Sequence, residues 1–205
     1  MKLYYAPGAC SLAPHIVARE AGLRLDLDKL DFATRKTEGG EDFSVVNPKG
    51  YVPALRLDSG EVLTEVATLV QYLADQAPQS GLAPAAGTIE RYRLQEWITF
   101  VSTEIHKGFG PLWNPAMPEA AKEIAKANLA KRFAFLDGEL AKRPYLTGER
   151  FTAADAYLFT VVNWTNIHKI DLSPYPNLKA FMDRVAARPA VRQALQAEGL
   201  LKQAA

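Results

Sequence analysis

The sequence of 205 residues is poor in the features that mark several large classes of protein. It contains one cysteine, Cys10, so an internal disulfide and a zinc site built from thiolates are both excluded. Its 24 Lys and Arg residues nearly balance its 23 Asp and Glu residues, and no basic cluster favours nucleic acid or an anionic membrane. No apolar run approaches the roughly 18 residues that a membrane-spanning helix needs.

The rest of the composition is that of an ordinary folded protein, because 48% of the residues are hydrophobic and 23% are charged. The length favours one large domain or two small ones. The segment Met1–Tyr5 runs directly into a turn at Pro7-Gly8 without a long apolar stretch, which does not fit a secretory signal peptide. We therefore expect a cytoplasmic protein that binds neither nucleic acid nor a membrane.

Residues 1–78 alternate between strand-like and helix-like patterns, which predicts a small α/β domain with a mixed sheet, arranged as βαβ followed by ββα. The expected strands are 2–6, 25–30, 54–57 and 61–63, and the expected helices are 11–21 and 65–77. Proline and glycine then recur through residues 79–87, as is typical of a linker. Residues 88–205 contain no alternating run, so they predict an all-helical bundle domain.

Helical periodicity gives two long helices of this region an apolar face. The residues on these faces are Leu94, Trp97, Val101 and Ile105, and Leu129, Phe133, Leu136 and Leu140. Thr152 and Asp155 have the spacing of a capping box, and the apolar stretch 156–164 that follows predicts a buried central helix. Pro189 and Gly199 frame a last short helix.

Cys10 lies between the Pro7-Gly8 turn and the start of the first predicted helix. Backbone amides and the positive end of the helix dipole at that position favour thiolate over thiol. No second cysteine follows three residues later, which excludes a dithiol cycle but leaves chemistry with the thiol of another molecule. The alternative is that Cys10 is a small buried hydrophobic residue.

Three further features fit either a ligand site or an ordinary structural role. Pro53 at the entrance of a strand leaves the backbone of Val52 available to pair with a peptide ligand, or the segment is a plain turn into a strand. Glu65 begins a helix, where its carboxylate can face an ammonium group, or the helix start is merely capped. Arg35 can hold a carboxylate with two hydrogen bonds, or it is a solvated surface residue.

The first long helix also carries a polar stripe away from its apolar face. The stripe consists of Thr99, Ser102, Thr103 and His106. A histidine among hydroxyls can donate to a sulfur atom or can be an ordinary surface residue. His15 and His168 are isolated, which favours structural or solvated roles. Three histidines this dispersed have no metal-ligand spacing, so no metal is expected.

Segments spread over the whole chain carry motifs that occur together in one family. They are Met1–Tyr5, Pro7–Leu12, Asn47–Gly50, Val52–Leu55, Leu63–Glu65, Gln71–Asp75, Glu104–Lys107 and Phe151–Tyr157. Through them the sequence resembles the bacterial beta-class glutathione transferases. The resemblance implies a thioredoxin-like, glutathione-binding domain over 1–78, an all-helical domain over 88–205, and a homodimer with its active site near the subunit interface. It also implies a cis peptide bond between Val52 and Pro53.

The same resemblance implies two sets of site residues. Those expected to bind glutathione are Cys10, Arg35, Val52, Glu65, Val66, Thr99, Thr103, Glu104 and His106. Those expected in the pocket for the second substrate are Tyr5, Phe109, Trp113 and Trp164. Cys10 would lie beside the glutathione sulfur with His106 near it, so these two are the expected catalytic residues.

Individual contacts with glutathione follow from the resemblance, with three departures from the family's pattern. Val52 would pair with the cysteinyl backbone, and Glu65 would hold the γ-glutamyl end. Val66 stands where serine or glycine is frequent, so a side-chain hydroxyl contact is lost and only backbone amides remain. Arg35 replaces a lysine that usually meets the glycyl carboxylate, and because the charge is retained we expect the contact to be retained. Thr99 stands where asparagine is common.

The implied enzyme is a glutathione S-transferase that conjugates the glutathione thiolate to hydrophobic electrophiles. Glutathione is its co-substrate, and no cofactor is expected. Cys10 would add glutathione-dependent thiol-disulfide exchange. Two alternatives remain open at this point: a non-catalytic glutathione-binding or chaperone-like protein, and a specialised glutathione-dependent dehalogenase or isomerase on the same fold.

Overall fold

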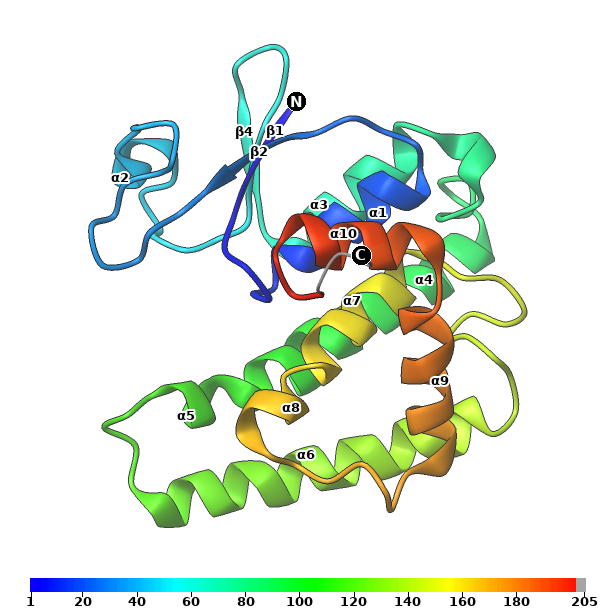
Figure 1. The fold of residues 1–205 in the computed structure, drawn as a ribbon. Coiled ribbons are helices and arrows are strands. Elements are labelled where there is room, and N and C mark those ends of the chain that lie inside the picture. Colours follow the sequence, from blue (N-terminus) through cyan, green and yellow to red (C-terminus); the bar gives the residue numbers. More distant parts are fainter. Residues whose placement is uncertain (202–205) are drawn as a thin grey trace. The chain divides into compact units, whose positions relative to one another are not determined.

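The computed structural model describes residues 1–201, which fall into two compact units (Figure 1). The first unit comprises Met1–Ala83 together with the described residues from Ala187 onward, and the second comprises Pro84–Ala186. The division after Ala83 lies inside the stretch predicted as a linker. The sequence prediction placed all of 88–205 in the helical domain, whereas the contacts group the last helix with the first unit.

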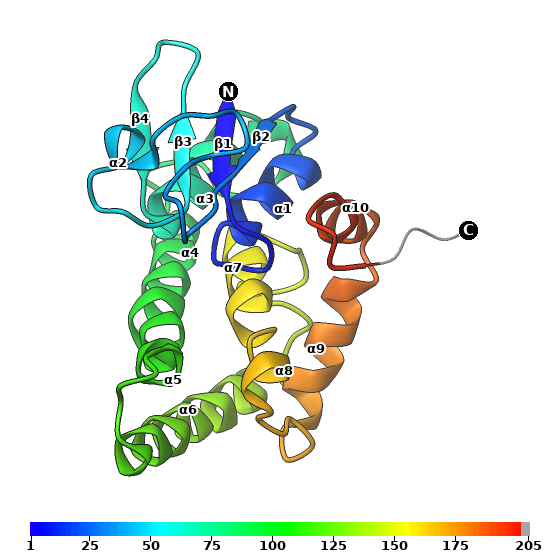
Figure 2. The same cartoon turned by 60° about the vertical axis from the view of Figure 1, so that its left-hand side comes forward.

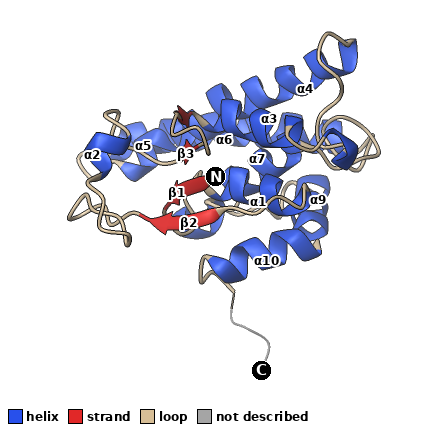
Figure 3. Ribbon diagram, turned by 90° about the horizontal axis from the view of Figure 1, so that it is seen from above, coloured by secondary structure: helices blue, strands red, loops and turns tan. Residues whose placement is uncertain are grey.

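The first unit contains a mixed sheet, as the α/β pattern predicts. Its strands are β1 (Lys2–Tyr5), β2 (Asp26–Lys29), β3 (Ala54–Arg56) and β4 (Val62–Thr64). They follow the order β2-β1-β3-β4, with β1 parallel to β2 and the other pairs antiparallel. In the described part of the chain, strands occur only in this unit (Figure 3).

Helices complete the first unit. They are α1 (Leu12–Glu20), α2 (Phe43–Val46), α3 (Val66–Asp75), the 3-10 turn η1 (Pro78–Ser80) and α10 (Pro189–Ala197). Helix α1 contacts both α3 and α10, and the three lie side by side in Figure 1. The single turn of α2 was not predicted, because four residues are too few to show a helical period.

Helix α10 is attached to α1 by charge as well as by apolar packing. Arg188 donates two hydrogen bonds to the Glu20 carboxylate, at 2.6 and 2.8 Å. Val191 and Leu195 are buried on the same helix. Pro189 opens the helix and Gly199 follows its end with a φ of 73°, as the sequence predicts. The last helix is therefore a structural part of the first unit.

The second unit is helical. Its elements are α4 (Ile89–Phe100), the π-helical segment η2 (Val101–His106), the 3-10 turn η3 (Lys107–Phe109), α5 (Gly110–Trp113), α6 (Glu119–Leu140), α7 (Ala153–Val162), α8 (Thr165–His168) and α9 (Pro176–Ala186). Helix α7 lies between α4 and α9 (Figure 2). Every residue of α7 is buried, which confirms the predicted central helix.

The predicted capping box opens this central helix. The Asp155 carboxylate accepts hydrogen bonds from the Thr152 backbone amide at 2.7 Å and from the Thr152 hydroxyl at 2.8 Å. It also accepts one from the Leu146 amide at 2.8 Å, which ties the preceding loop to the helix. Burial raises the pKa of the Asp155 carboxyl to about 6 against the opposing effect of these donors.

The apolar face predicted for the first long helix is correct except at one position. Leu94, Val101 and Ile105 are buried, but Trp97 is half-buried and Ile98 occupies the buried position instead. The helix also changes from α to π geometry after Phe100, a change that a regular period does not predict. No helix among the described residues is long and apolar enough to cross a membrane.

Candidate functional site

Cys10 lies in the turn that connects β1 to α1, just before the first turn of that helix. Its thiol is half-buried and donates a hydrogen bond to the Val52 carbonyl oxygen at 3.2 Å. The buried Ser11 hydroxyl exchanges hydrogen bonds with the Ala6 amide and carbonyl, both at 3.2 Å. These two hydrogen bonds hold the turn closed and so fix the position of the Cys10 backbone.

A buried carboxylate holds the other end of the same turn. Glu198, at the end of α10, accepts a hydrogen bond from the Gly8 amide at 3.0 Å. The second oxygen of Glu198 lies 2.9 Å from Nδ1 of His15 on α1. Both side chains are almost completely buried, so this pair gives His15 the structural role that the sequence favours. Gly8 has a φ of 70°, a conformation that glycine adopts without strain.

The segment 47–53 forms the next part of the site. The Val52-Pro53 peptide bond is cis, which confirms what the resemblance implies. The Asn47 side chain donates to the Tyr51 carbonyl at 2.7 Å, and Arg35 donates to the Gly50 carbonyl at 2.7 Å. The guanidinium expected at a ligand carboxylate therefore contacts the backbone of this segment.

Glu65 joins β4 to α3 and has a φ of 71°, which is unusual for a residue with a side chain. Its carboxylate accepts hydrogen bonds from the Lys49 ammonium and from the Tyr51 hydroxyl, each at 2.7 Å. These bonds raise the pKa of both Lys49 and Tyr51. Glu65 thus faces an ammonium group, as the sequence suggests, although that ammonium belongs to the chain itself. Val66, the first residue of α3, is buried.

These contacts connect the expected glutathione residues of the first unit through one segment. Cys10 contacts Val52, and the adjacent Tyr51 contacts Glu65. Cys10 and Glu65, which lie far apart in the sequence, therefore both contact the dipeptide Tyr51-Val52. The arrangement provides a thiol, a peptide backbone and a carboxylate in succession, which are the groups needed to hold an extended thiol peptide.

In the second unit, His106 ends the π-helical segment η2. Its Nδ1 lies 2.6 Å from the Tyr157 hydroxyl, and its ring packs edge-on against Trp164 with ring centres 5.0 Å apart. Phe109 and Trp113 pack edge-on against the same indole, at 5.5 and 5.4 Å. Phe109 and Trp164 are buried, whereas Trp113 is 46% exposed.

The aromatic group just described contains three of the four residues expected in the second-substrate pocket, namely Phe109, Trp113 and Trp164. The fourth, Tyr5, belongs to the first unit, where it is buried and burial raises its pKa. His168 packs against Trp113 with ring centres 4.4 Å apart, and its buried Nε2 makes no hydrogen bond. Burial lowers the pKa of His168, so the neutral ring is favoured there.

The remaining expected residues, Thr99, Thr103 and Glu104, contact other residues of the second unit. Thr99 and Thr103 are exposed, and the Thr103 hydroxyl donates to the Thr99 carbonyl at 3.0 Å. The Glu104 carboxylate is paired with Arg132 of α6 at 2.6 Å. Thr99 and Thr103, two residues of the predicted polar stripe, are therefore at the surface. The adjacent Glu104 forms an ion pair with α6.

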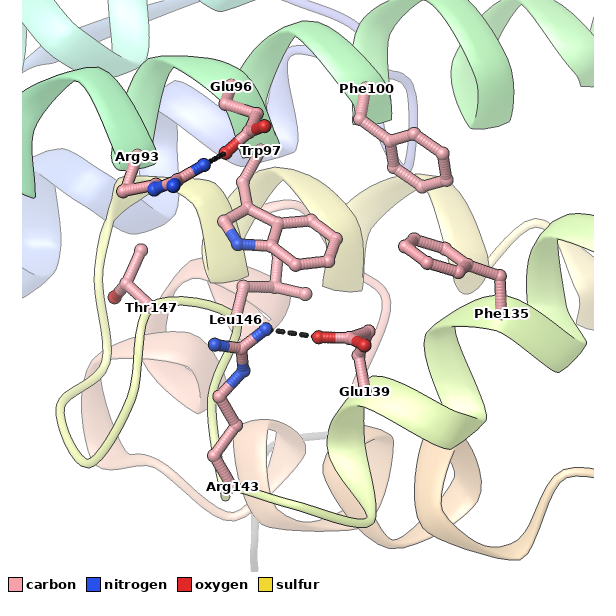
Figure 4. A pocket seen from close by; sticks show the side chains of 9 residues that line it. All are labelled: Arg93, Glu96, Trp97, Phe100, Phe135, Glu139, Arg143, Leu146 and Thr147. Carbon is pink, nitrogen blue, oxygen red and sulfur yellow. Dashed lines mark hydrogen bonds and ion pairs between the residues drawn. The ribbon is translucent and has the colours of Figure 1, made fainter.

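A separate cavity of about 540 Å³ lies between α4 and α6 (Figure 4). Trp97, Phe100 and Phe135 form its apolar wall, and the ion pairs Arg93–Glu96 and Arg143–Glu139 border it. None of the residues expected in the glutathione site lines it. Among the described residues, no group of three His, Cys, Asp or Glu side chains is placed to hold a metal ion.

Comparison with known proteins places both units in one family. Residues 8–76 match the family described as glutathione S-transferase, N-terminal domain, and residues 100–189 match glutathione S-transferase, C-terminal domain. The chain is 46% identical over 200 residues to glutathione S-transferase GstA of Escherichia coli O157:H7, covering 98% of this chain and 100% of GstA. The chain belongs to the glutathione S-transferase family.

Solved structures of glutathione S-transferases agree with this assignment. A sphingomonad glutathione S-transferase complexed with glutathione is 51% identical, with a TM-score of 0.95 over 98% of this chain and 100% of that one. The beta-class enzyme of Sphingomonas chungbukensis is 50% identical, with the same TM-score and coverage. The resemblance to bacterial beta-class glutathione transferases and the predicted fold class are thereby confirmed.

The sequence did not single out three residues that contact the expected site residues or the turn that carries Cys10. Lys49 pairs with Glu65, Glu198 holds the turn that carries Cys10, and Tyr157 contacts His106. In the sequence, Lys49 and Tyr157 stand out only as parts of the matching motifs Asn47–Gly50 and Phe151–Tyr157. Nothing local to Glu198 indicates a partner 190 positions away.

Proposed function

We propose that this glutathione S-transferase family member binds glutathione, stabilises its thiolate and transfers it to hydrophobic electrophiles. The observation that carries the proposal is the continuous line of contacts from Cys10 through Val52 and Tyr51 to Glu65. Glutathione is a tripeptide with a central thiol. The Glu65 carboxylate suits its γ-glutamyl ammonium, the backbone of Val52 suits its cysteinyl backbone, and the Cys10 thiol suits its sulfur.

The γ-glutamyl end carries an ammonium and a carboxylate. Glu65 supplies a carboxylate that already holds an ammonium group, that of Lys49, at 2.7 Å. That ion pair is about half exposed, so its net contribution is small and a ligand ammonium can replace it. The amides at the start of α3, from Val66 onward, are suited to the ligand carboxylate.

The cysteinyl part of glutathione would pair with the backbone of Val52, which places its sulfur beside Cys10. To bind the glycyl carboxylate, the Arg35 guanidinium would either give up its hydrogen bond to the Gly50 carbonyl or keep that bond and donate another to the ligand. The thiolate needs hydrogen-bond donors and a positive potential, and we assign these to the N-terminus of α1 and to His106. Thr99, Thr103 and Glu104 are the further residues that we assign to glutathione binding.

The electrophile would bind against the aromatic group of the second unit. Trp113, whose side chain is 46% exposed, presents ring surface, and it packs against the buried Trp164, which in turn contacts the buried Phe109. Such surface suits a hydrophobic second substrate. In this proposal residues 1–78 form the glutathione-binding domain, glutathione is the co-substrate without a further cofactor, and the cytoplasmic enzyme acts as a homodimer.

We infer a second activity, thiol-disulfide exchange, from the partial exposure of the Cys10 thiol beside Val52. The Cys10 thiolate would attack one sulfur of a disulfide, form a mixed disulfide and release the other sulfur as a thiolate. A glutathione thiolate would then attack the mixed disulfide and regenerate Cys10 as a thiolate. When the mixed disulfide carries a glutathionyl group, this second step forms oxidised glutathione, so glutathione is the reductant for the thiolate released in the first step.

Paired assays of wild type and Cys10→Ala test both activities. We expect the wild type to conjugate glutathione to a model aryl halide, and the variant to retain altered but measurable conjugation. Exchange with a small glutathionyl mixed disulfide should be lost in the variant. Glutathione binding without turnover of any electrophile in a broad panel would contradict the transferase proposal, and exchange retained by Cys10→Ala would contradict the role of the thiol.

A further inference from the structure

We propose that Tyr157 is a positioning residue that fixes the tautomer of His106, so that His106 carries its ring proton on Nε2 and presents that N–H to the glutathione sulfur. The inference about the sulfur rests on the function proposed above. The inference about the tautomer stands on the geometry of the second unit alone, and the two parts are tested separately.

The direction of the hydrogen bond follows from the chemistry of its two groups. The Tyr157 hydroxyl and Nδ1 of His106 lie 2.6 Å apart, which is a short hydrogen bond. A phenolic O–H is a good donor and a poor acceptor, whereas an unprotonated imidazole nitrogen is a strong acceptor. The hydroxyl therefore donates to Nδ1. Because a neutral imidazole carries one proton, that proton lies on Nε2.

The surroundings of Tyr157 hold its side chain in a fixed position. It lies on α7, where its side chain is 1% exposed, and the helix begins with the capping box between Thr152 and Asp155. A buried aromatic side chain on a central helix has little freedom to follow a movement of its partner. The position of the hydroxyl is thus set by the core of the unit.

The ring of His106 is also restrained on two of its sides. It packs edge-on against the Tyr157 ring, with centres 5.7 Å apart at 87°, and against Trp164, with centres 5.0 Å apart at 74°. A 180° flip of the ring would put Cδ2 in the place of Nδ1 and so break the hydrogen bond to Tyr157. The orientation of the ring and its tautomer are therefore coupled to one hydroxyl group.

Whether His106 can stabilise a thiolate by donating a hydrogen bond to it depends on the tautomer of the ring. With the proton on Nε2, that nitrogen is a donor that stabilises negative charge on sulfur. With the proton on Nδ1, the Nε2 lone pair would face the sulfur and repel the thiolate. Tyr157 would thus act through His106 without contacting either substrate.

Nitrogen-15 NMR of the ligand-free protein tests the tautomer directly. The chain has three histidines, so His106→Phe identifies the signals of His106 by their loss. At a pH where His106 is neutral, we expect a pyridine-type, hydrogen-bonded Nδ1 and a pyrrole-type Nε2. In Tyr157→Phe the Nδ1 signal should lose its hydrogen-bond shift. A proton on Nδ1 in the wild type, or unchanged signals in Tyr157→Phe, would overturn the proposal.

Kinetics then test whether Tyr157 acts through His106. In the wild-type background we expect Tyr157→Phe to lower kcat for conjugation about tenfold, as for loss of one oriented hydrogen bond, with little change in the KM for glutathione. In the His106→Phe background the same change should have no further effect. Equal losses in both backgrounds would show that Tyr157 is merely structural and would overturn the coupling.

A matched control and the NMR result separate the possible failures. Tyr175→Phe removes a hydroxyl from the same unit, at a ring that packs against Phe133, and should leave the His106 signals and kcat unchanged. If the wild type transfers no glutathione at all, the proposed function fails, while the NMR spectra still decide the tautomer. If transfer is normal but the tautomer is the opposite one, only the role of Tyr157 fails.

Discussion

The thiol of Cys10 donates a hydrogen bond to the carbonyl oxygen of Val52 across 3.2 Å, although the two residues are 42 positions apart. The contact joins the turn before α1 to the segment before β3. In the binding mode proposed above, a thiol peptide that pairs with the backbone of Val52 would bring its own sulfur to Cys10.

The first prediction concerns a covalent adduct at Cys10. Incubation with oxidised glutathione should add one glutathionyl group to the chain, because the bound disulfide presents a sulfur to the thiol. Intact-mass spectrometry measures the product, and the assignment is simple because the chain has a single cysteine. Dithiothreitol should remove the adduct.

The control for this adduct is the denatured chain, in which the same thiol is fully exposed but has no binding site. We expect the native protein to react faster than the chain in urea at equal pH, and Cys10→Ser to remain unmodified. Slower reaction of the native protein would mean that the fold only shields the thiol, and the proposed role of Cys10 in exchange would be wrong.

The second prediction concerns the carboxylate of Glu65. Glu65→Gln keeps the size of the side chain but removes the charge that would hold the γ-glutamyl ammonium. We expect the KM for glutathione to rise about tenfold, equivalent to about 1.4 kcal/mol, with a smaller change in kcat. Glu61→Gln, an exposed carboxylate on the neighbouring hairpin, is the matched control and should have no effect. The role of Glu65 fails if both variants bind glutathione equally well.

The third prediction concerns the buried carboxylate of Glu198. Glu198→Ala leaves the amide of Gly8 and the imidazole of His15 without this partner in a buried place. We expect the free energy of unfolding to fall by about 2–4 kcal/mol, measured by urea denaturation. Glu198→Gln retains an acceptor and should cost less. Glu38→Ala, at an exposed ion pair, should change stability by less than about 1 kcal/mol.

The effect of Glu198 should extend to catalysis, because the turn that it holds carries Cys10. Glu198→Gln should be studied for this purpose at a temperature where it remains folded. We expect slower adduct formation at Cys10 than in the wild type. An unchanged rate would show that Glu198 contributes to stability alone.

The fourth prediction concerns pH and the carboxylate of Glu41. Hydrogen bonds from Arg56, and then from Tyr4 and Lys2, lower the pKa of Glu41 from 4.5 to about 2 against the effect of burial. The folded protein therefore favours the ionised form more than the unfolded chain does. The resulting stabilisation is complete above about pH 4.5 and is lost as the pH falls toward about 2.

Urea denaturation of wild type and Glu41→Gln over a pH series measures this contribution. The side chain is 30% exposed, so solvent weakens the interaction, and we expect a difference of about 1–2 kcal/mol at pH 7. The difference should shrink steadily below pH 4.5. A difference that stays constant between neutral and acidic pH would contradict the assignment of the shift to the ionised carboxylate.

Much of the fold could be predicted from local sequence. Alternation of apolar residues indicates the strands, and the capping box of Thr152 and Asp155 marks the start of the buried helix. Gly22 and Gly199 follow the ends of their helices with positive φ, as expected of helix stops. These features depend on neighbours within one turn or one strand, so the sequence contains the information directly.

The rest depends on contacts between distant parts of the chain. Nothing near Glu198 indicates that it holds the turn before α1, and therefore the last helix could not be assigned to the first unit. The π-helical segment changes the helical period beyond Phe100, and Trp97 turns toward a cavity instead of the core. The pairing of His106 with Tyr157 spans 51 positions and likewise has no local signal.

A crystal structure of this chain with bound glutathione tests the central proposal most directly. The proposal predicts that the glutathione sulfur lies within hydrogen-bond distance of the Cys10 thiol, that its cysteinyl backbone pairs with Val52, and that its ammonium takes the place of Lys49 at Glu65. Glutathione bound elsewhere, or bound with its sulfur turned away from Cys10, would contradict the proposal.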